Sequence, residues 1–461
     1  MSELARFDHQ MTADERRATW GLGLLFSLRM LGMFMVLPVL TTYGMALQGA
    51  TPSLIGLAIG IYGLAQALCQ IPLGVWSDRL GRLPLIVAGL LLFALGAVVA
   101  ALSDSIWGVI LGRGLQGAGA ISAVVLALLS DLTREQNRTK AMAVIGMSFG
   151  ITFAIAMVTG PLLAQHFGIR SLFWGIALLA VLAIGVVLWV VPRPASHLRN
   201  RESAIVGQGL RQAWAEPRLQ RLYLGIFSLH LLLMMSFVAL PDALVKVGLE
   251  RDRQWLVYLI TLLISFVAVL PGIIYAEKQR QTRRVFLGAI LLLCVGELLL
   301  CGGGRVSLLL LLLGLQLFFV AFNLLEALLP SLISKEAPAG LKGTAMGLYS
   351  TAQFLGVALG GMLGGWLLEH MAVGQIFMLA ALLAGLWWLR VRQMPEPAHV
   401  SSLRLQLTVA ALRDPRRLQE KLLAQPGVQQ VLIVSSESSA YIKVDTRQSS
   451  RLDLEALVAA G

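Results

Sequence analysis

Four ionisable side chains lie deep inside long apolar runs of this chain, and they are the first candidates for chemistry. They are Arg29, Arg113, His230 and Glu326. An ionisable group at membrane depth is energetically costly, so such a residue is a functional candidate by default. Histidine titrates near neutral pH, and a carboxyl group among apolar atoms can exchange a proton in the same range. The four residues predict proton coupling, with Glu326 as the best acidic carrier.

Each candidate also has a structural interpretation that the sequence leaves open. His230 can pack between helices with its ring bonded to a backbone carbonyl group, and Arg113 can be a structural hydrogen-bond donor. Glu326 can remain a neutral, hydrogen-bonded acid. Two further acids, Glu297 and Asp242, lie nearer the ends of their runs and are interpreted as rim groups.

A second group of charges lies in GVWSDRLGRLPLI, residues 74–86, between two apolar runs. The stretch combines an acid with two arginines and two glycines: Asp78, Arg79, Arg82, Gly74 and Gly81. Glycines let backbones approach closely in a short turn, and arginines suit the headgroup level of a membrane. We expect Asp78 to be ion-paired or to face a helix N-terminus, so that it latches the turn in one conformation. A solvated turn acid is the alternative.

Asp131 closes the fourth apolar run on the same predicted side of the membrane. A chain from Asp78 through Arg82 to Asp131 would tie the turn together. Protonation of either acid would then weaken the chain and help an inner gate to move.

The elements that hold these residues are predicted to be membrane-spanning helices. The chain has 461 residues, of which 57% are hydrophobic and only 13% charged, whereas roughly a quarter of a soluble domain is charged. Apolar runs of about 20 residues, which suffice to cross a bilayer as helices, recur along most of the length. Twelve spans are predicted, at Trp20–Tyr43, Leu54–Trp76, Leu83–Leu102, Ile106–Ser130, Ala141–His166, Leu172–Val191, Leu222–Leu244, Trp255–Tyr275, Val285–Cys301, Ser307–Leu332, Gly343–Leu368 and Gln375–Leu389.

Lysine and arginine are unevenly distributed over the loops between these spans. One set of alternate loops holds most of them, and the other set holds only Arg170, Lys246, Arg251, Arg253 and Arg305. The positive-inside rule therefore places both termini of this multi-pass membrane protein in the cytoplasm. The same rule accounts for the net charge of +12, so we expect no nucleic-acid partner.

The chain contains two related halves. FSLRMLGMFMVLP at 26–38 resembles FSLHLLLMMSFVALP at 227–241, and GLQ at 114–116 recurs at 314–316. Such repeats predict two pseudo-symmetric six-helix bundles, within 1–192 and 220–394, joined by a basic cytoplasmic linker at 193–219. Duplicated halves with a site between them are typical of secondary transporters, in which one half rocks against the other.

Several motifs resemble those of the major facilitator superfamily. GVWSDRLGRLPLI resembles its loop signature G-x-x-x-D-R-x-G-R-(R/K), although Leu83 stands where a third base is common. LGRGLQGAGA at 111–120 resembles the fourth-helix motif R-x-x-Q-G. Gly150, Gly160 and Pro161 resemble the antiporter motif, although Ala164–Gln165 replaces its second glycine pair. The resemblance implies the superfamily fold, a place in the bacterial inner membrane, proton-driven efflux in the drug/proton antiporter group, and a coupling role for Arg113.

Further candidates line the predicted spans. Residues that would suit an apolar substrate cavity are Phe34, Tyr62, Gln66, Asn323 and Gln353. Residues predicted for hinging or close helix packing are Gly117, Gly160, Pro161, Gly360 and Gly364. Aromatic residues in spans more often pack or face lipid, and static packing explains small residues equally well.

After Pro397 the composition changes to that of a small soluble domain. SLRLQLTV, VQQVLIVS and SAYIKVD read as strands, and DPRRLQEKLLAQPG and RLDLEALVAA as helices. The order predicts a cytoplasmic βαββα ferredoxin-like domain over residues 399–461. The domain has no cysteine, so we expect no thiolate metal site. A regulatory role, self-association and a passive appendage all remain open.

The sequence as a whole predicts an all-α polytopic membrane protein that exports small amphipathic molecules in exchange for protons. Its expected partners are the substrate, protons and the lipid bilayer, with the proton gradient as energy source and no cofactor or metal. A transporter-fold sensor that signals through the C-terminal domain is one alternative, and a passive facilitator or importer is another. Enzyme activity is not expected, because no nucleophile–base grouping, phosphate loop or zinc signature is found.

Overall fold

The structure is a computed structural model that describes residues 11–193, 206–338, 341–396, 401–407, 414–434, 439–445, 448–449, 454 and 456–458. In this part of the chain, 12 spans are long and apolar enough to cross a membrane. Most are single helices: α2 (Ala13–Tyr43), α3 (Pro52–Leu80), α4 (Arg82–Leu102), α7 (Glu135–Phe167), α8 (Ile169–Trp189), α10 (Pro217–Lys246), α11 (Gln254–Lys278), α12 (Thr282–Val306), α13 (Leu308–Glu336), α14 (Lys342–His370) and α15 (Val373–Val391). The fourth span consists of α5 (Ile106–Ala118) and α6 (Ser122–Leu132), and a short helix, α9 (Val206–Ala215), precedes α10.

Helices occupy all the predicted spans, and most of them extend beyond the predicted ends. The reason is that local capping, rather than the end of the apolar run, decides where a helix begins. α2 begins at Ala13 instead of Trp20, because Thr12 and Glu15 form a capping box there. The span predicted at Ile106–Ser130 is present, but its helix is interrupted after Ala118.

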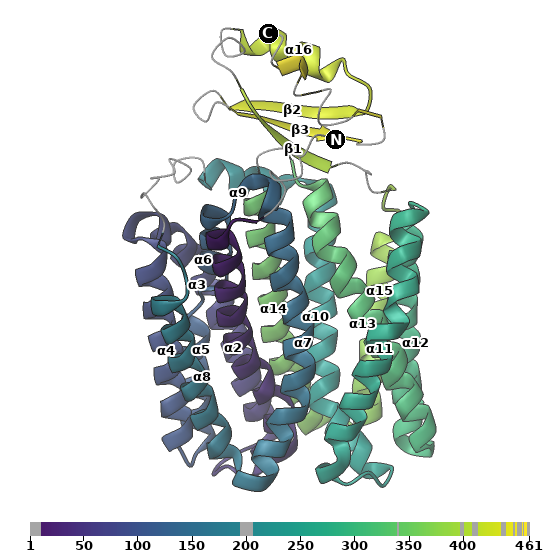
Figure 1. Cartoon of the computed structure of the whole chain (residues 1–461). Coiled ribbons are helices and arrows are strands. Elements are labelled where there is room, and N and C mark those ends of the chain that lie inside the picture. The colour runs from purple at the N-terminus through teal and green to yellow at the C-terminus, as the bar shows by residue number, and fades with distance from the viewer. Residues whose placement is uncertain are drawn as a thin grey trace.

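The helices form two bundles, α2–α8 and α10–α15, which we call the N-terminal half and the C-terminal half (Figure 1). α2 begins and α15 ends on the side of the helices where the small C-terminal sheet lies. We call this the domain side and the opposite one the far side.

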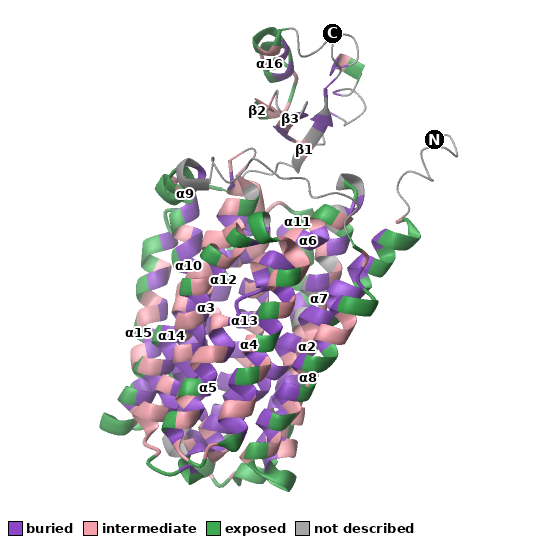
Figure 2. Cartoon of the chain, turned by 90° about the vertical axis from the view of Figure 1, so that its left-hand side faces the viewer, coloured by how far each residue is buried: buried purple, intermediate pink, exposed green. Residues whose placement is uncertain are grey.

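Burial in the helices is the pattern expected of a protein surrounded by lipid. Buried residues fill the interior of the bundles, and exposed ones mark their outer faces (Figure 2). Many of the exposed residues are large and apolar, including Leu68, Leu178, Val267 and Leu382. An apolar surface of this extent is unfavourable in water and suits contact with acyl chains.

The turn between α3 and α4 is shorter than predicted. α3 continues to Leu80, α4 begins at Arg82, and Gly81 alone separates them, with a φ of 96° that favours glycine. Gly74 lies inside α3, where a Cβ atom would be 3.9 Å from the Ala123 Cβ, an ordinary contact. The expectation that Gly74 serves a close backbone approach in the turn is therefore wrong for this conformation.

The C-terminal domain is a three-stranded antiparallel sheet with one well-defined helix. The strands β1 (Ser401–Gln406), β2 (Val428–Val434) and β3 (Ser439–Val444) have the order β1-β3-β2, and α16 (Pro415–Leu423) packs with them. Asp414 caps α16 by accepting a hydrogen bond from the Arg417 amide at 3.1 Å. The predicted helix end at Gly427 is wrong, since that residue precedes β2 with a φ of 76°. Of the second predicted helix, residues 454 and 456–458 are helical, and the remainder lies outside the described residues.

Candidate functional site

Three polar side chains from three helices of the C-terminal half meet about halfway along the membrane-spanning helices. Gln353 of α14 lies between His230 of α10 and Glu326 of α13. Its Nε2 atom is 2.9 Å from His230 Nε2 and 3.4 Å from Glu326 Oε1. His230 Nε2 and Glu326 Oε2 are 4.0 Å apart. We call His230, Gln353 and Glu326 the C-half cluster.

The hydrogen bonds of the cluster indicate where the histidine carries its proton. His230 Nδ1 is 3.2 Å from the Ile226 carbonyl oxygen, which can only accept, so Nδ1 carries the hydrogen. The amide nitrogen of Gln353 can only donate, so His230 Nε2 accepts. A proton that arrives on His230 Nε2 would displace this hydrogen bond and leave an ion pair with Glu326.

The Glu326 carboxyl group is the least satisfied member of the cluster. Its Oε2 atom has no hydrogen-bond partner in the described part of the chain. The side chain keeps 21% of its surface exposed, whereas that of His230 keeps only 6%. One turn earlier on α13, the Asn323 amide nitrogen also lacks a partner among the described residues. A carboxylate oxygen and an amide donor are therefore both buried next to the cluster without a hydrogen-bond partner among the described residues.

A series of aromatic rings connects the C-half cluster to the N-terminal half. Phe322 of α13 lies 5.7 Å from the His230 ring and 6.5 Å from Phe153 of α7, measured between centroids. Phe153 in turn meets Phe34 of α2 edge-on at 4.9 Å. The cluster therefore lies beside the surface along which the two halves meet. Phe34, a predicted cavity residue, is part of this contact.

Arg29 does not face His230, although the two occupy corresponding positions in α2 and α10. Its guanidinium group donates to the Ser122 hydroxyl at 2.9 Å, to Gln66 Oε1 at 2.7 Å and to the Gly119 carbonyl oxygen at 3.3 Å. The residue is 1% exposed and these contacts lie within the N-terminal half. Arg29 is thus held by neutral acceptors, and its role in proton coupling stays an untested prediction.

Tyr62 and Gln66 are fully engaged inside the N-terminal half. The Tyr62 hydroxyl is 3.4 Å from Arg29 Nη2, and both side chains are buried at 1% and 0% exposure. Their predicted place in a substrate cavity is therefore closed off in this conformation.

Arg113 also binds neutral groups. It donates to Gln116 Oε1 at 2.8 Å and to the Ala58 carbonyl oxygen at 3.4 Å, and its guanidinium carbon lies 4.3 Å from the centre of the Tyr62 ring. It is 3% exposed. Because Tyr62 also contacts Arg29, the two arginines share one buried polar network.

Part of the predicted domain-side latch is present. Arg82 Nε donates to Asp131 Oδ2 at 3.1 Å, and Arg82 also binds the Ser77 hydroxyl. Arg79 is exposed, and the side chain of Asp78 lies outside the described residues. The structure thus joins α4 to α6 through Arg82 and Asp131, and the link from Asp78 stays a prediction.

The two halves contact each other most closely on the far side, where α3 packs against α14. A Cβ atom on Gly60 would lie 2.5 Å from the Ala358 carbonyl oxygen, and one on Gly63 would lie 2.7 Å from that of Phe354. Near the far-side end, a Cβ on Gly56 would lie 2.7 Å from Gly365 Cα. These distances leave no room for a side chain, so glycine is required for the contact.

On the domain side the same two helices diverge. A Cβ atom on Gly347, in the domain-side part of α14, would meet no heavy atom of the described residues within 4 Å. In α3, the nearest atom to such a Cβ on Gly74 belongs to Ala123 of its own half. α3 and α14 are therefore closely packed on the far side and apart at these domain-side positions.

The predicted packing glycines divide among three contacts between helices. Gly360 and Gly364 face α10, where Cβ atoms would lie 2.9 Å from Met234 Cβ and 3.0 Å from Met235 Cα. Gly117 packs on α3, and Gly160 packs on α2 next to Pro161. These four contacts lie within a half, so they favour static packing over hinging in this conformation.

Comparison with known proteins agrees with this architecture. Residues 22–361 match the Major Facilitator Superfamily. The chain belongs to the Major Facilitator Superfamily. Residues 403–460 match the YajR YAM domain. The predicted superfamily resemblance is confirmed, and the protein is a multi-pass membrane transporter of this superfamily.

Two relatives and one solved structure place the protein within the superfamily. It is 58% identical over 449 residues to the inner membrane transport protein YajR of Escherichia coli (strain K12), covering 97% of this chain and 98% of the relative. Multidrug resistance protein MdtH of Yersinia pestis (strain Pestoides F) is 26% identical over 384 residues, covering 81% and 94%. The D-xylose-proton symporter has a TM-score of 0.69 at 16% identity, covering 83% of this chain and 99% of that chain, which shows the fold alone.

One acid of this superfamily member was misplaced by the sequence interpretation. Glu297 of α12 is fully buried, and its Oε1 accepts a hydrogen bond from the Ser236 hydroxyl of α10 at 2.6 Å. The prediction of a rim group is wrong for Glu297, because position along a helix says nothing about which neighbour covers it. Asp242 is half-buried and pairs with Arg251 at 3.4 Å, which suits a rim.

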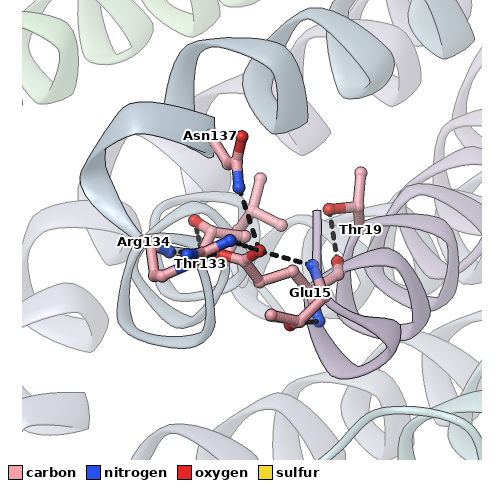
Figure 3. Close-up of polar contacts among 7 residues, drawn as sticks. Glu15, Thr19, Thr133, Arg134 and Asn137 are labelled. Carbon is pink, nitrogen blue, oxygen red and sulfur yellow. Dashed lines mark hydrogen bonds and ion pairs between the residues drawn. The ribbon is translucent and has the colours of Figure 1, made fainter. Parts of the chain in front are cut away.

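The sequence interpretation missed Glu15, which anchors the loop between α6 and α7. Its carboxylate accepts hydrogen bonds from the Arg134 amide at 2.7 Å, Arg134 Nε at 3.1 Å and Asn137 Nδ2 at 3.0 Å (Figure 3). It also accepts from the Thr12 amide at 2.8 Å. The only sequence signal was the spacing of Thr12 and Glu15, which is that of a capping box.

The C-terminal domain contacts the domain-side ends of the C-terminal half. Arg280, between α11 and α12, donates to both carboxylate oxygens of Asp445, at 3.0 and 3.1 Å. Lys443 of β3 donates to the Lys335 carbonyl oxygen at 2.7 Å. Burial lowers the pKa of the Lys443 ammonium group below its ordinary value. A cavity of about 260 Å³ lies between the domain and the ends of α10 and α13.

Proposed function

We propose that the protein exports small amphipathic molecules in exchange for protons by alternating access. The C-half cluster carries this proposal, because one oxygen of its carboxyl group lies 4.0 Å from a histidine ring nitrogen and has no hydrogen-bond partner among the described residues. A proton-coupled transporter needs a group inside the membrane that binds and releases a proton. Glu326 is the proton carrier in this proposal.

The cluster geometry suggests how protonation is linked to the position of the halves. Gln353 donates to both His230 and Glu326, and α14, which carries Gln353, also closes the far side against α3. Protonation of Glu326 removes the negative charge that strengthens its hydrogen bond from the Gln353 amide. We expect α14 to be freer to move after this change, so that proton binding favours release of the far-side contact.

The direction of transport follows from the predicted orientation. If the domain side is cytoplasmic, the present conformation is closed to the outside and separated on the inside. Such a conformation would load an exported molecule from the cytoplasm or the inner leaflet. The relationship to a multidrug resistance protein, at 26% identity, supports export of this kind of molecule.

The proposal is tested in proteoliposomes that contain the full chain, entrapped pyranine as a pH indicator and an imposed pH gradient. Ethidium serves as an amphipathic cation and para-aminohippurate as an organic anion. We expect at least one probe to move together with a change in lumenal pH, and Glu326→Gln to abolish the pH change. Glu297→Gln is the matched control, since it neutralises a buried acid of the same half that lies away from Gln353. Movement of a probe without any pH change in the wild type would favour the passive facilitator.

A second proposal concerns the C-terminal domain. Arg280 and Asp445 form a two-point ion pair between the domain and the C-terminal half, which favours a regulatory role over a passive appendage. Docking or release of the domain would then be transmitted through Arg280 to α11 and α12. Self-association through the domain stays an alternative.

A further inference from the structure

The fourth span is broken in the middle of the membrane. α5 ends at Ala118 and α6 begins at Ser122, with Gly119 at a ψ of 43° and Ile121 at a ψ of −2° between them. The last carbonyl groups of a helix have no partner within that helix. At membrane depth no bulk water replaces the missing partners, so protein groups must do so.

Close packing holds the break on two sides. Gly119 of the break lies against the backbone of Gly89 in α4, and Gly117 against α3, where a Cβ would be 2.9 Å from Ala65 Cβ. The glycines of the 111–120 motif therefore let α3 and α4 approach the break. They do not supply hydrogen bonds to it.

Within the break the Gly119 carbonyl oxygen accepts a hydrogen bond from the Ile121 amide at 2.9 Å, and the guanidinium group of Arg29 adds a second donor there and bridges the break. Nη2 donates to the Gly119 carbonyl oxygen at the end of α5, and Nη1 donates to the Ser122 hydroxyl at the start of α6. Gln66 accepts from Nη2 and its own amide lies 3.5 Å from the Ser122 hydroxyl. A cation is favoured at the C-terminal end of a helix, and the planar fork of arginine suits two acceptors at once.

The helix that carries Arg29 also binds the segment that follows α6. Glu15, at the start of α2, binds Arg134, two residues beyond the end of α6, and Asn137 in the first turn of α7 (Figure 3). Between these two attachments lies Asp131, which is the partner of Arg82. α2 thus bonds to the start of α6 and to the segment after its end, and these bonds help to position Asp131 against Arg82.

We infer that Arg29 is a positioning residue that bridges the break in the fourth span and holds α6 on α2. Its guanidinium group acts through α6 on the Asp131–Arg82 pair and carries no transported proton. This inference does not depend on the proposed proton coupling. Either one can fail while the other stands.

The test is hydrogen–deuterium exchange of the full-length protein in lipid nanodiscs, followed by mass spectrometry. Arg29→Met removes both hydrogen bonds across the break. We expect amide exchange in residues 119–134 to rise about tenfold or more, as follows from loss of a charge-assisted hydrogen bond. Arg29→Lys keeps the charge without the fork, so it should restore part of the protection. Ser122→Ala removes only the α6 acceptor and should raise exchange less than Arg29→Met.

Arg113→Met is the matched control, because it removes the other buried arginine of the network and leaves the break bridged. We expect its exchange in residues 122–134 to match that of the wild type. Unchanged exchange in Arg29→Met overturns the inference, and so does a rise spread equally over α3 and α4, which indicates general loosening. Full protection in Arg29→Lys also overturns it, since a point charge would then suffice. If Arg29→Met does not fold, the exchange of Arg29→Lys and Ser122→Ala decides instead. Exchange in residues 119–134 equal to that of the wild type in both variants overturns the inference.

Discussion

A close contact between the halves offers a direct perturbation of the conformational equilibrium. A Cβ atom on Gly60 would lie 2.5 Å from the Ala358 carbonyl oxygen, whereas ordinary contacts begin near 3.4 Å. Gly60→Ala therefore forces α3 and α14 apart by about 0.9 Å where they pack on the far side. Overpacking of this kind costs about 1–3 kcal/mol, and the cost applies only while the far side is closed.

The expected shift follows from this cost. Since about 1.4 kcal/mol changes an equilibrium tenfold, the ratio of far-side-open to far-side-closed protein should rise about 5- to 150-fold. The assay is pulsed electron paramagnetic resonance on spin labels at Met45 and Met371, which are exposed on the far side of the two halves. The native cysteines are first replaced, at Cys69, Cys294 and Cys301.

Gly347→Ala is the control for this experiment. It lies in α14, where a Cβ meets no atom of the described residues within 4 Å. Both substitutions gain about 1 kcal/mol of helix propensity, so this gain cancels in the comparison. The reasoning is refuted if Gly60→Ala leaves the distance distribution unchanged, or if Gly347→Ala shifts it equally.

Three further predictions concern the domain side. Asp131→Asn should weaken the partly exposed pair with Arg82 by about 0.2–1 kcal/mol, seen as a small drop in thermal stability, while Glu396→Gln, at an exposed acid outside the helices and strands, should cause none. Asp445→Asn should release the C-terminal domain, so the distribution of distances between spin labels at Leu423 and Tyr275 should become broader. An unchanged distribution would show that the ion pair between Arg280 and Asp445 does not hold the domain. The lowered pKa of Lys443 means that the docked domain holds fewer protons than the released one between that pKa and the ordinary value. Docking of the domain should therefore strengthen as pH rises through this window, and the distribution of distances between the same two spin labels should become narrower. A broader distribution at higher pH would contradict the burial of the Lys443 ammonium group in the docked domain.

Much of the fold could be predicted from the sequence because the membrane makes local sequence decisive. A segment surrounded by lipid must satisfy its own backbone, so each long apolar run has to be a helix. Internal similarity near an offset of 200 residues indicated two related halves, and the motif at 74–86 indicated the superfamily. The depth of Glu326 along its helix was also visible, because a helix rises a fixed distance per residue.

What each polar side chain contacts was decided by the tertiary structure alone. Arg29 and His230 occupy matching positions, yet Arg29 bridges a broken helix and His230 joins Gln353 and Glu326. Glu297 was expected at a rim and is buried against Ser236. The reason is rotational: sequence fixes how deep a residue lies in the membrane, but the packing of neighbouring helices fixes which of them its side chain meets.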